Sequence, residues 1–261
     1  MHFKEIFINR HSEVRVGWRL TLFSVALVIA VGLVQTVLSS LGFRLEFISI
    51  ALILAVVLGV TLLMTRFVNK KPFGAIGLSI HPLMFRELGL GCLIGFLMIT
   101  GVFLVELASG YIHVVWRDYT LLQSLRVVVM SLLFFAAAAL FEEVLYRGYF
   151  FQTLMQWITF LPAALILAVV FALSHARNPN VTTFALINVA LAGIWLSIAY
   201  MKTRSLWLPF GLHASWNFSQ TTLYAFPTSG GTFDEQRLAD AIQSGPEWIT
   251  GGAFGPEGGA L

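Results

Sequence analysis

Two adjacent glutamates inside a long apolar stretch are the residues of this sequence best suited to chemistry. They lie in the segment Phe141-Glu142-Glu143-Val144-Leu145-Tyr146-Arg147. An ionisable side chain at the centre of a bilayer costs about 2.5–3.5 kcal/mol to insert, so it requires a partner, a cavity or a function. Glu143 and Arg147 are four residues apart and share one helix face, where they can form an ion pair. Glu142 points about 100° away from that face and is a candidate general base, although a purely structural cluster is an equal alternative.

Two later segments carry the other candidate groups. His175 ends an apolar stretch, and Phe171 lies one turn earlier on the same helix face. We expect Phe171, together with Tyr146, to form the wall of a cavity beside the imidazole. His213 and Asn217 are four residues apart and point the same way. Each feature alone has a plainer explanation, since histidines favour wet helix ends and paired polar side chains can hold membrane helices together.

The expected depth of these residues in the membrane joins them into one site. At 1.5 Å per residue, Glu142 and His175 lie roughly 20–25 Å from the turn expected at 159–162. His213 and Asn217 lie roughly 12–18 Å from the loop that precedes their helix, on the same side of the membrane. These depths overlap once the helices tilt, so a shared, water-filled cavity is the simplest explanation for three helices with polar groups.

The four residues together suit the hydrolysis of an amide. A carboxylate and a neutral imidazole, here Glu142 and His175, can activate a water molecule. A second histidine and an amide, here His213 and Asn217, can donate hydrogen bonds to the oxyanion of a tetrahedral intermediate. The sequence has no Gly-x-Ser-x-Gly elbow, no His-Glu-x-x-His zinc motif and no phosphate-binding glycine loop. We predict no cofactor, although Glu142, His175 and His213 could also supply a zinc site of two histidines and one carboxylate.

Membrane-spanning helices must position these residues, because the composition excludes an ordinary soluble domain. Of the 261 residues, 58% are hydrophobic and only 11% are charged, whereas about a quarter charged is usual in soluble domains. Apolar runs of about twenty residues can cross a bilayer as helices. We therefore predict an all-α, polytopic transmembrane bundle of about seven spans, at 20–41, 47–64, 88–108, 125–158, 161–174, 182–201 and 206–225.

The predicted bundle, residues 20–225, is flanked by two other segments. Lys and Arg are concentrated in the loops on the side of the N-terminus, which places segment 1–19 in the cytoplasm and the bundle in the plasma (cytoplasmic) membrane. Glycines and prolines punctuate residues 226–261, which predicts a poorly ordered tail with at most a short helix at 234–243. The net charge is only +3, so we expect a lipid bilayer as partner and no nucleic acid.

The order of these motifs on successive apolar helices resembles a known family. The chain is similar to the CAAX-processing and bacteriocin-processing family of intramembrane proteases (CPBP, or Abi), and in particular to type II CAAX prenyl endopeptidases. The motifs that carry the resemblance are Glu142-Glu143-x-x-x-Arg147, Phe171-x-x-x-His175 and His213-x-x-x-Asn217. The segments Thr203–Pro209 and Lys71–Gly74 also resemble that family, and the similarity covers about residues 70–225.

The resemblance implies an intramembrane endopeptidase that cleaves a prenylated CAAX-type peptide or another membrane-associated peptide. It implies that Glu142 and His175 activate the water, that His213 and Asn217 stabilise the oxyanion, and that the second glutamate and its arginine order the helix. Members of the family often continue with one more membrane helix after such a glycine-rich segment. The resemblance therefore leaves two alternatives open: a bundle of the seven spans given above, or a bundle of eight whose last span is missing after Leu261.

Two functions without proteolysis would use the same residues. An immunity or scaffold protein would hold peptides or partner helices in the cavity and would not hydrolyse them. A transporter or proton relay would also bury Glu and His, but the spans show no paired broken helices in two halves of the chain. Replacement of Glu142 distinguishes these cases, because a hydrolase would lose cleavage and a binding protein would keep its ligand.

Overall fold

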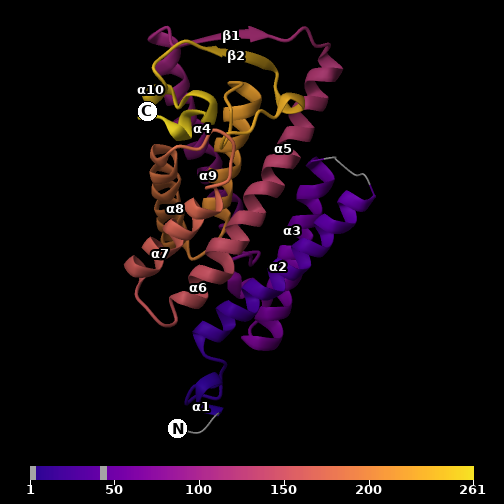
Figure 1. Ribbon diagram of the computed structural model, residues 1–261, viewed down its shortest axis with the longest axis vertical. Coiled ribbons are helices and arrows are strands. Elements are labelled where there is room, and N and C mark those ends of the chain that lie inside the picture. The colour runs from indigo at the N-terminus through magenta and orange to yellow at the C-terminus, as the bar shows by residue number, and fades with distance from the viewer. Residues whose placement is uncertain (1–3, 42–45) are drawn as a thin grey trace.

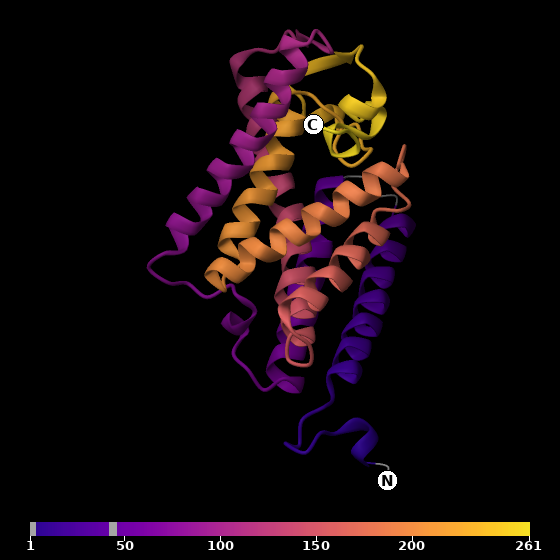
Figure 2. The ribbon, with the colours of Figure 1, turned by 90° about the vertical axis from the view of Figure 1, so that its left-hand side faces the viewer.

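A computed structural model describes residues 4–41 and 46–261 of the chain. The first three residues of the predicted segment 1–19 lie outside the described residues. The molecule is a bundle of long helices with a small two-stranded sheet at one end (Figure 1). The N-terminal helix α1 (Lys4–Phe7) lies at the opposite end of the molecule from the C-terminal segment, as Figures 1 and 2 both show.

Long apolar helices make up the bundle and confirm the predicted all-α fold class. Within the described part of the chain, five helices are long and apolar enough to cross a membrane, and α7 is apolar but shorter. Two of the five contain short π-helical turns. The whole bundle, including the shorter α7 and α9, consists of α2 (Val16–Ser40), α3 (Glu46–Leu63) with η1 (Met64–Val68), α4 (Met84–Ala108), α5 (Leu121–Glu143) with η3 (Val144–Phe150) and α6 (Phe151–Leu154), α7 (Phe160–Ser174), α8 (Thr183–Thr203), and α9 (Trp207–Phe218) with η4 (Ser219–Leu223).

Apolar side chains cover the outside of the bundle as well as its inside. Val28 on α2 is 73% exposed, Leu33 is 62% exposed, and Leu104 on α4 is 54% exposed. In water such a surface would be unfavourable, whereas in lipid it is the expected exterior of a spanning helix. The exposed apolar surface therefore agrees with the composition in placing the chain in a membrane.

Helix α5 runs through the middle of the bundle. Figure 1 shows α2 and α3 on one side of it and α7, α8 and α9 on the other. Helix α3 packs on α2 and α5, and α7 packs on α8. Helix α5 also packs on α9, which brings the glutamate segment and the His213–Asn217 segment together.

Helices α4 and α9 approach each other so closely that only glycine fits at the crossing. A Cβ atom at Gly91 would lie 2.2 Å from the Leu208 carbonyl oxygen, and one at Gly95 would lie 2.2 Å from the Leu212 oxygen. From the other side, a Cβ at Gly211 would lie 2.4 Å from the Leu88 oxygen. Small residues spaced by four are a common way to bring membrane helices into backbone contact. This crossing sets the position of α9 and hence of His213 and Asn217.

The C-terminal segment is folded, contrary to the poorly ordered tail predicted from its composition. Residues Ala239–Gln243 form β2, antiparallel to β1 (Ile112–Trp116), so the predicted helix at 234–243 is wrong. Only Asp234–Gln236 forms a 3-10 turn there. The rest contains α10 (Glu247–Thr250) and the 3-10 turns η6 (Gly252–Phe254) and η7 (Pro256–Gly258).

Glycine in this segment allows close packing and does not indicate disorder. Gly251 and Gly255 have φ angles of 77° and 95°, in the left-handed region that other residues avoid. A Cβ atom at Gly255 would lie 2.0 Å from the Pro227 carbonyl oxygen. Phe254 is 1% exposed and packs with Tyr146 and Phe171 of the bundle. A composition typical of linkers is therefore also compatible with a tight, glycine-dependent fold.

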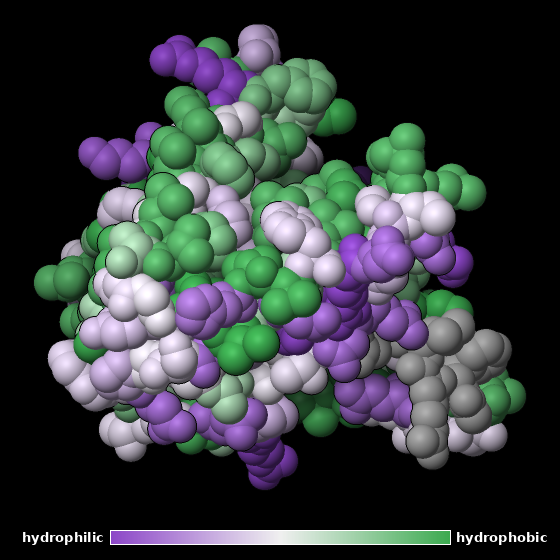
Figure 3. All heavy atoms as spheres, turned by 90° about the horizontal axis from the view of Figure 1, so that it is seen from above, coloured by the Kyte–Doolittle hydropathy of each residue, from purple (hydrophilic) through white to green (hydrophobic). Residues whose placement is uncertain are grey.

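An ion pair fastens the sheet to the loop that leads into α5. The Arg117 guanidinium donates to both oxygens of Asp240, over 2.6 Å and 3.0 Å, and to the Asp234 carbonyl over 2.6 Å. The Arg117 guanidinium lowers the pKa of the Asp240 carboxyl. Seen from this end, hydrophilic residues are scattered among apolar ones (Figure 3), which suits a surface outside the hydrocarbon core.

The α4–α9 crossing generates a stability prediction. A leucine at Gly95 must displace the backbone of α9, whereas nothing lies within 4 Å of a Cβ at Gly101 on the same helix. We expect Gly95→Leu to lower the unfolding free energy by at least about 1–3 kcal/mol, the usual cost of over-packing. We expect Gly101→Leu to unfold like the wild type when both are heated in detergent and followed by tryptophan fluorescence. Equal unfolding temperatures for the two variants would contradict the close crossing.

Candidate active site

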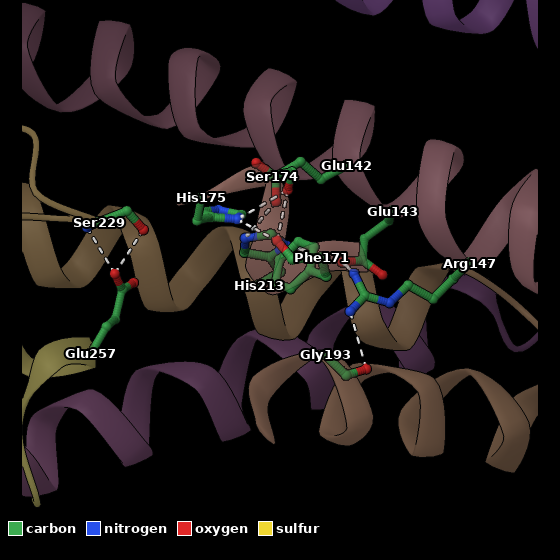
Figure 4. Close-up of polar contacts among 10 residues, drawn as sticks. All are labelled: Glu142, Glu143, Arg147, Phe171, Ser174, His175, Gly193, His213, Ser229 and Glu257. Atoms are coloured by element: carbon green, nitrogen blue, oxygen red, sulfur yellow. Dashed lines mark hydrogen bonds and ion pairs between the residues drawn. The ribbon is translucent and has the colours of Figure 1, made fainter. Parts of the chain in front are cut away.

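The Glu143 carboxylate is the acceptor around which the site is built. It is fully buried, and its Oε1 accepts from Arg147 Nη1 over 3.0 Å and from His213 Nδ1 over 3.0 Å (Figure 4). Arg147 Nη2 also donates to the Gly193 carbonyl of α8 over 3.1 Å. The ion pair expected from the i, i+4 spacing is thus present, and it extends to α9, which local spacing could not reveal.

Aromatic rings enclose the arginine and one of the histidines. The Arg147 guanidinium lies 4.7 Å from the centre of the Phe171 ring and 5.8 Å from that of Tyr146, in cation–π range. The Phe171 and His175 ring centres are 4.7 Å apart, so Phe171 separates the guanidinium from the imidazole. Phe171 and Tyr146 each line a cavity of the site, where the sequence placed them as walls.

His213 bridges the two glutamates. Its Nδ1 contacts Glu143, and its Nε2 lies 3.8 Å from Glu142 Oε2. That Glu142 oxygen is buried and has no hydrogen-bond partner among the described residues. The two glutamates differ in what they face: Glu143 binds Arg147 and His213 through Oε1 and lines neither cavity, whereas Glu142 lines both. In each of them Oε2 has no hydrogen-bond partner among the described residues.

His175 is held in one orientation by its own helix. It follows the last residue of α7, and its Nδ1 lies 2.8 Å from the Phe171 carbonyl oxygen and 3.2 Å from Ser174 Oγ. A carbonyl oxygen can only accept, so Nδ1 carries the proton in this contact. The other ring nitrogen, Nε2, then has a free lone pair in the neutral imidazole, which is the form that a base requires.

Two cavities meet at these residues. The larger has a volume of about 560 Å³, and the predicted catalytic residues Glu142, His175, His213 and Asn217 all line it. The smaller, of about 270 Å³, shares Glu142, His175 and Asn217 with the first. The Asn217 side chain has no hydrogen-bond partner among the described residues and is free to contact a ligand. The structure thus brings together every residue that the sequence assigned to the site.

Two π-helical turns follow the site residues directly. Segment η3 begins after Glu143, and η4 begins shortly after Asn217. Such turns insert an extra residue into a helix and recur at functional sites, because they rotate the following side chains. Periodicity over a few residues cannot detect them, and the sequence predicted regular helices at both places.

The C-terminal segment contributes site residues that sequence reasoning missed. Glu257 lines the larger cavity, and its Oε2 accepts from Ser229 N and from Ser229 Oγ, each over 2.7 Å. Asn188 Nδ2 donates to the Glu257 carbonyl over 3.0 Å and to the Gly259 carbonyl over 2.7 Å. Asn188 is a polar residue in an apolar helix, and a single glutamate in a glycine-rich segment carries no periodic signal.

The zinc site left open by the sequence is not assembled. In segments 4–41 and 46–261, no three His, Cys, Asp or Glu side chains lie close enough together to hold one metal ion. Glu142 and His213 approach each other, but with His175 they do not form a ligand set.

Comparisons with known proteins bear on the same segment. Residues 123–219 match the family described as type II CAAX prenyl endopeptidase Rce1-like. A comparison with curated proteins found no match, and a comparison with solved structures found none. The matched segment contains all three motifs of the predicted resemblance. The match over residues 123–219 therefore confirms the resemblance to type II CAAX prenyl endopeptidases that the motifs predicted.

Proposed function

We propose that this integral membrane protein is an endopeptidase in which Glu142 and His175 activate a water molecule. The observation that supports this most is that Glu142 lines a cavity with His175, His213 and Asn217, and that its Oε2 has no hydrogen-bond partner in the described part of the chain. The family match supports a CAAX-type intramembrane endopeptidase in general. The roles of the individual residues are our proposal.

The first step is attack by water on the scissile carbonyl. A water between Glu142 and His175 Nε2 donates one proton to the Glu142 carboxylate and a hydrogen bond to the imidazole lone pair. The oxygen of this water then adds to the carbonyl carbon, and the carbonyl oxygen becomes an oxyanion. Glu142 later returns the proton to the leaving amine, as a general base often does.

The oxyanion is stabilised from α9. Asn217 Nδ2 supplies one donor. His213 supplies a second through Nε2 when the ring carries both protons, because Nδ1–H is already donated to Glu143. Donors that are in place before the reaction need no reorganisation as the charge develops. Glu143 and Arg147 act by fixing the orientation of His213, in addition to the role in ordering the helix that the resemblance implied.

We further propose that the substrate is a prenylated CAAX-type peptide or another membrane-associated peptide. Most of the side chains along the larger cavity are apolar, among them Phe184, Leu191 and Trp195 from α8. Such a wall suits a prenyl chain or an apolar segment that arrives from the bilayer. The proposed location is the plasma (cytoplasmic) membrane, with the N-terminus inside.

Removal of the base is the first test of this function. We expect Glu142→Gln to lower the cleavage of a farnesylated CAAX peptide by at least about 10²–10⁴-fold, because the amide cannot accept the proton of water. Glu247→Gln changes an exposed glutamate outside the cavities and should cleave like the wild type. Unfolding curves of both variants check the fold. Full cleavage by a folded Glu142→Gln protein would overturn the assignment of the base.

A second test addresses the oxyanion donors. Asn217→Ala removes a side chain that has no protein partner among the described residues, so the fold should tolerate it. We expect kcat to fall by about 10²–10³-fold, with little change in KM, since the lost contact forms only in the transition state. A variant that raised KM and kept kcat would instead place Asn217 in ground-state binding.

The third test concerns metal dependence. Glu142, His175 and His213 are not placed to hold one ion. We therefore expect cleavage to continue after dialysis against a strong chelator, measured with the same peptide and followed by metal analysis of the sample. Loss of activity on chelation, with recovery on added zinc, would show that the proposed mechanism is wrong.

A further inference from the structure

Glu257 is a carboxyl group in the active cavity that the proposed reaction does not use. It lies on η7 of the C-terminal segment, lines the 560 Å³ cavity and is half-buried. Figure 4 shows its side chain reaching toward Ser229, on the side of the site where His175 lies. A carboxyl group in such a position requires a partner or a ligand.

The Glu257 side chain is held firmly by one of its two oxygens. Oε2 accepts from the backbone N–H and the hydroxyl of Ser229, each over 2.7 Å. The backbone around it is fixed by Asn188, which donates to the Glu257 carbonyl over 3.0 Å. Two residues earlier, Gly255 adopts a φ of 95° against the Pro227 carbonyl, where a side chain would collide. The carboxyl position is therefore built into the fold.

The second oxygen of Glu257 remains available. No donor within the described ranges 4–41 and 46–261 contacts Oε1, and this atom is not among the buried, unsatisfied oxygens. Oε1 is thus able to accept a hydrogen bond from a molecule inside the cavity. Anchoring the segment needs only Oε2.

The charges around the cavity favour a cation as that molecule. No Lys or Arg is among the described residues that line either cavity, and Arg147 behind them is engaged by Glu143 and Gly193. Burial raises the pKa of the Glu257 carboxyl, opposed by the Ser229 hydrogen bonds and by the nearby His175 and His213. A cation bound at Oε1 would stabilise the ionised carboxylate. An acidic ligand would instead be repelled by both Glu257 and Glu142.

We propose that Glu257 is a specificity residue that selects a basic side chain on the substrate peptide. This proposal rests on the proposed endopeptidase function and adds a requirement to it. A lysine or arginine near the cleaved bond forms a charge-assisted hydrogen bond with Oε1 inside the cavity. Such bonds are stronger than neutral ones. A glutamate at the same place is rejected by the two carboxylates.

A peptide series tests this proposal. Single lysines replace norleucine at successive positions around the scissile bond of one membrane-associated peptide, and a glutamate series is the counterpart. We expect wild-type kcat/KM to be at least about tenfold higher for lysine than for norleucine at one position. Glu257→Gln keeps an oxygen for Ser229 and removes the charge, so the ratio should fall toward one. Glu247→Gln, on the same segment but outside the cavity, should keep the wild-type ratio.

The outcomes separate this proposal from a structural role and from failure of the proposed function. A lysine preference that persists in Glu257→Gln, or its absence in the wild type, would overturn the proposal. A purely structural Glu257 would change all peptides by one factor and leave the ratio unaltered. If no peptide is cleaved, fluorescence anisotropy of labelled peptides measures the same ratio in Kd. A lysine preference in binding that Glu257→Gln abolishes would then support Glu257 although the hydrolase assignment fails.

Discussion

The buried Glu143 carboxylate is the contact on which the rest of the site depends. It lies on α5, it accepts from Arg147 in η3, and it accepts from His213 on α9. Arg147 in turn reaches the Gly193 carbonyl on α8. One carboxylate thereby connects three helices in a region without bulk water. Removal of one partner of such a buried pair typically costs about 3–5 kcal/mol, because the other charge is left uncompensated.

This arrangement explains why two adjacent glutamates are needed. Glu143 binds Arg147 and His213 through Oε1 and lines neither cavity, so it can orient His213 but does not face the space where a water would react. Glu142, one position earlier on the same helix, lines both cavities, and none of the described residues hydrogen-bonds to its Oε2. The glycine crossing of α4 and α9 brings His213 within reach of both. The packing of the helices, and not only the position in the sequence, therefore gives Glu143 its structural role and leaves Glu142 for the proposed chemistry.

Much of the fold could be predicted because its signals are local. Hydropathy over about twenty residues located the helices, and i, i+4 spacing paired Glu143 with Arg147. The contact between His213 and Glu143 joins residues far apart in the chain, so no local rule could reveal it. The C-terminal segment was misjudged because its glycines have positive φ and close backbone contacts, which composition alone does not distinguish from a linker. Glu257 was missed for the same reason.

The most direct test compares the two glutamates under single-turnover conditions. Wild type, Glu142→Gln and Glu143→Gln are each mixed in excess with a farnesylated CAAX peptide, at a temperature where all three are folded. The proposed roles predict no detectable cleavage by Glu142→Gln and slowed but measurable cleavage by Glu143→Gln. Glu143→Gln should also unfold at a lower temperature. Cleavage by Glu142→Gln at a rate equal to or above that of Glu143→Gln would contradict the proposed division of roles.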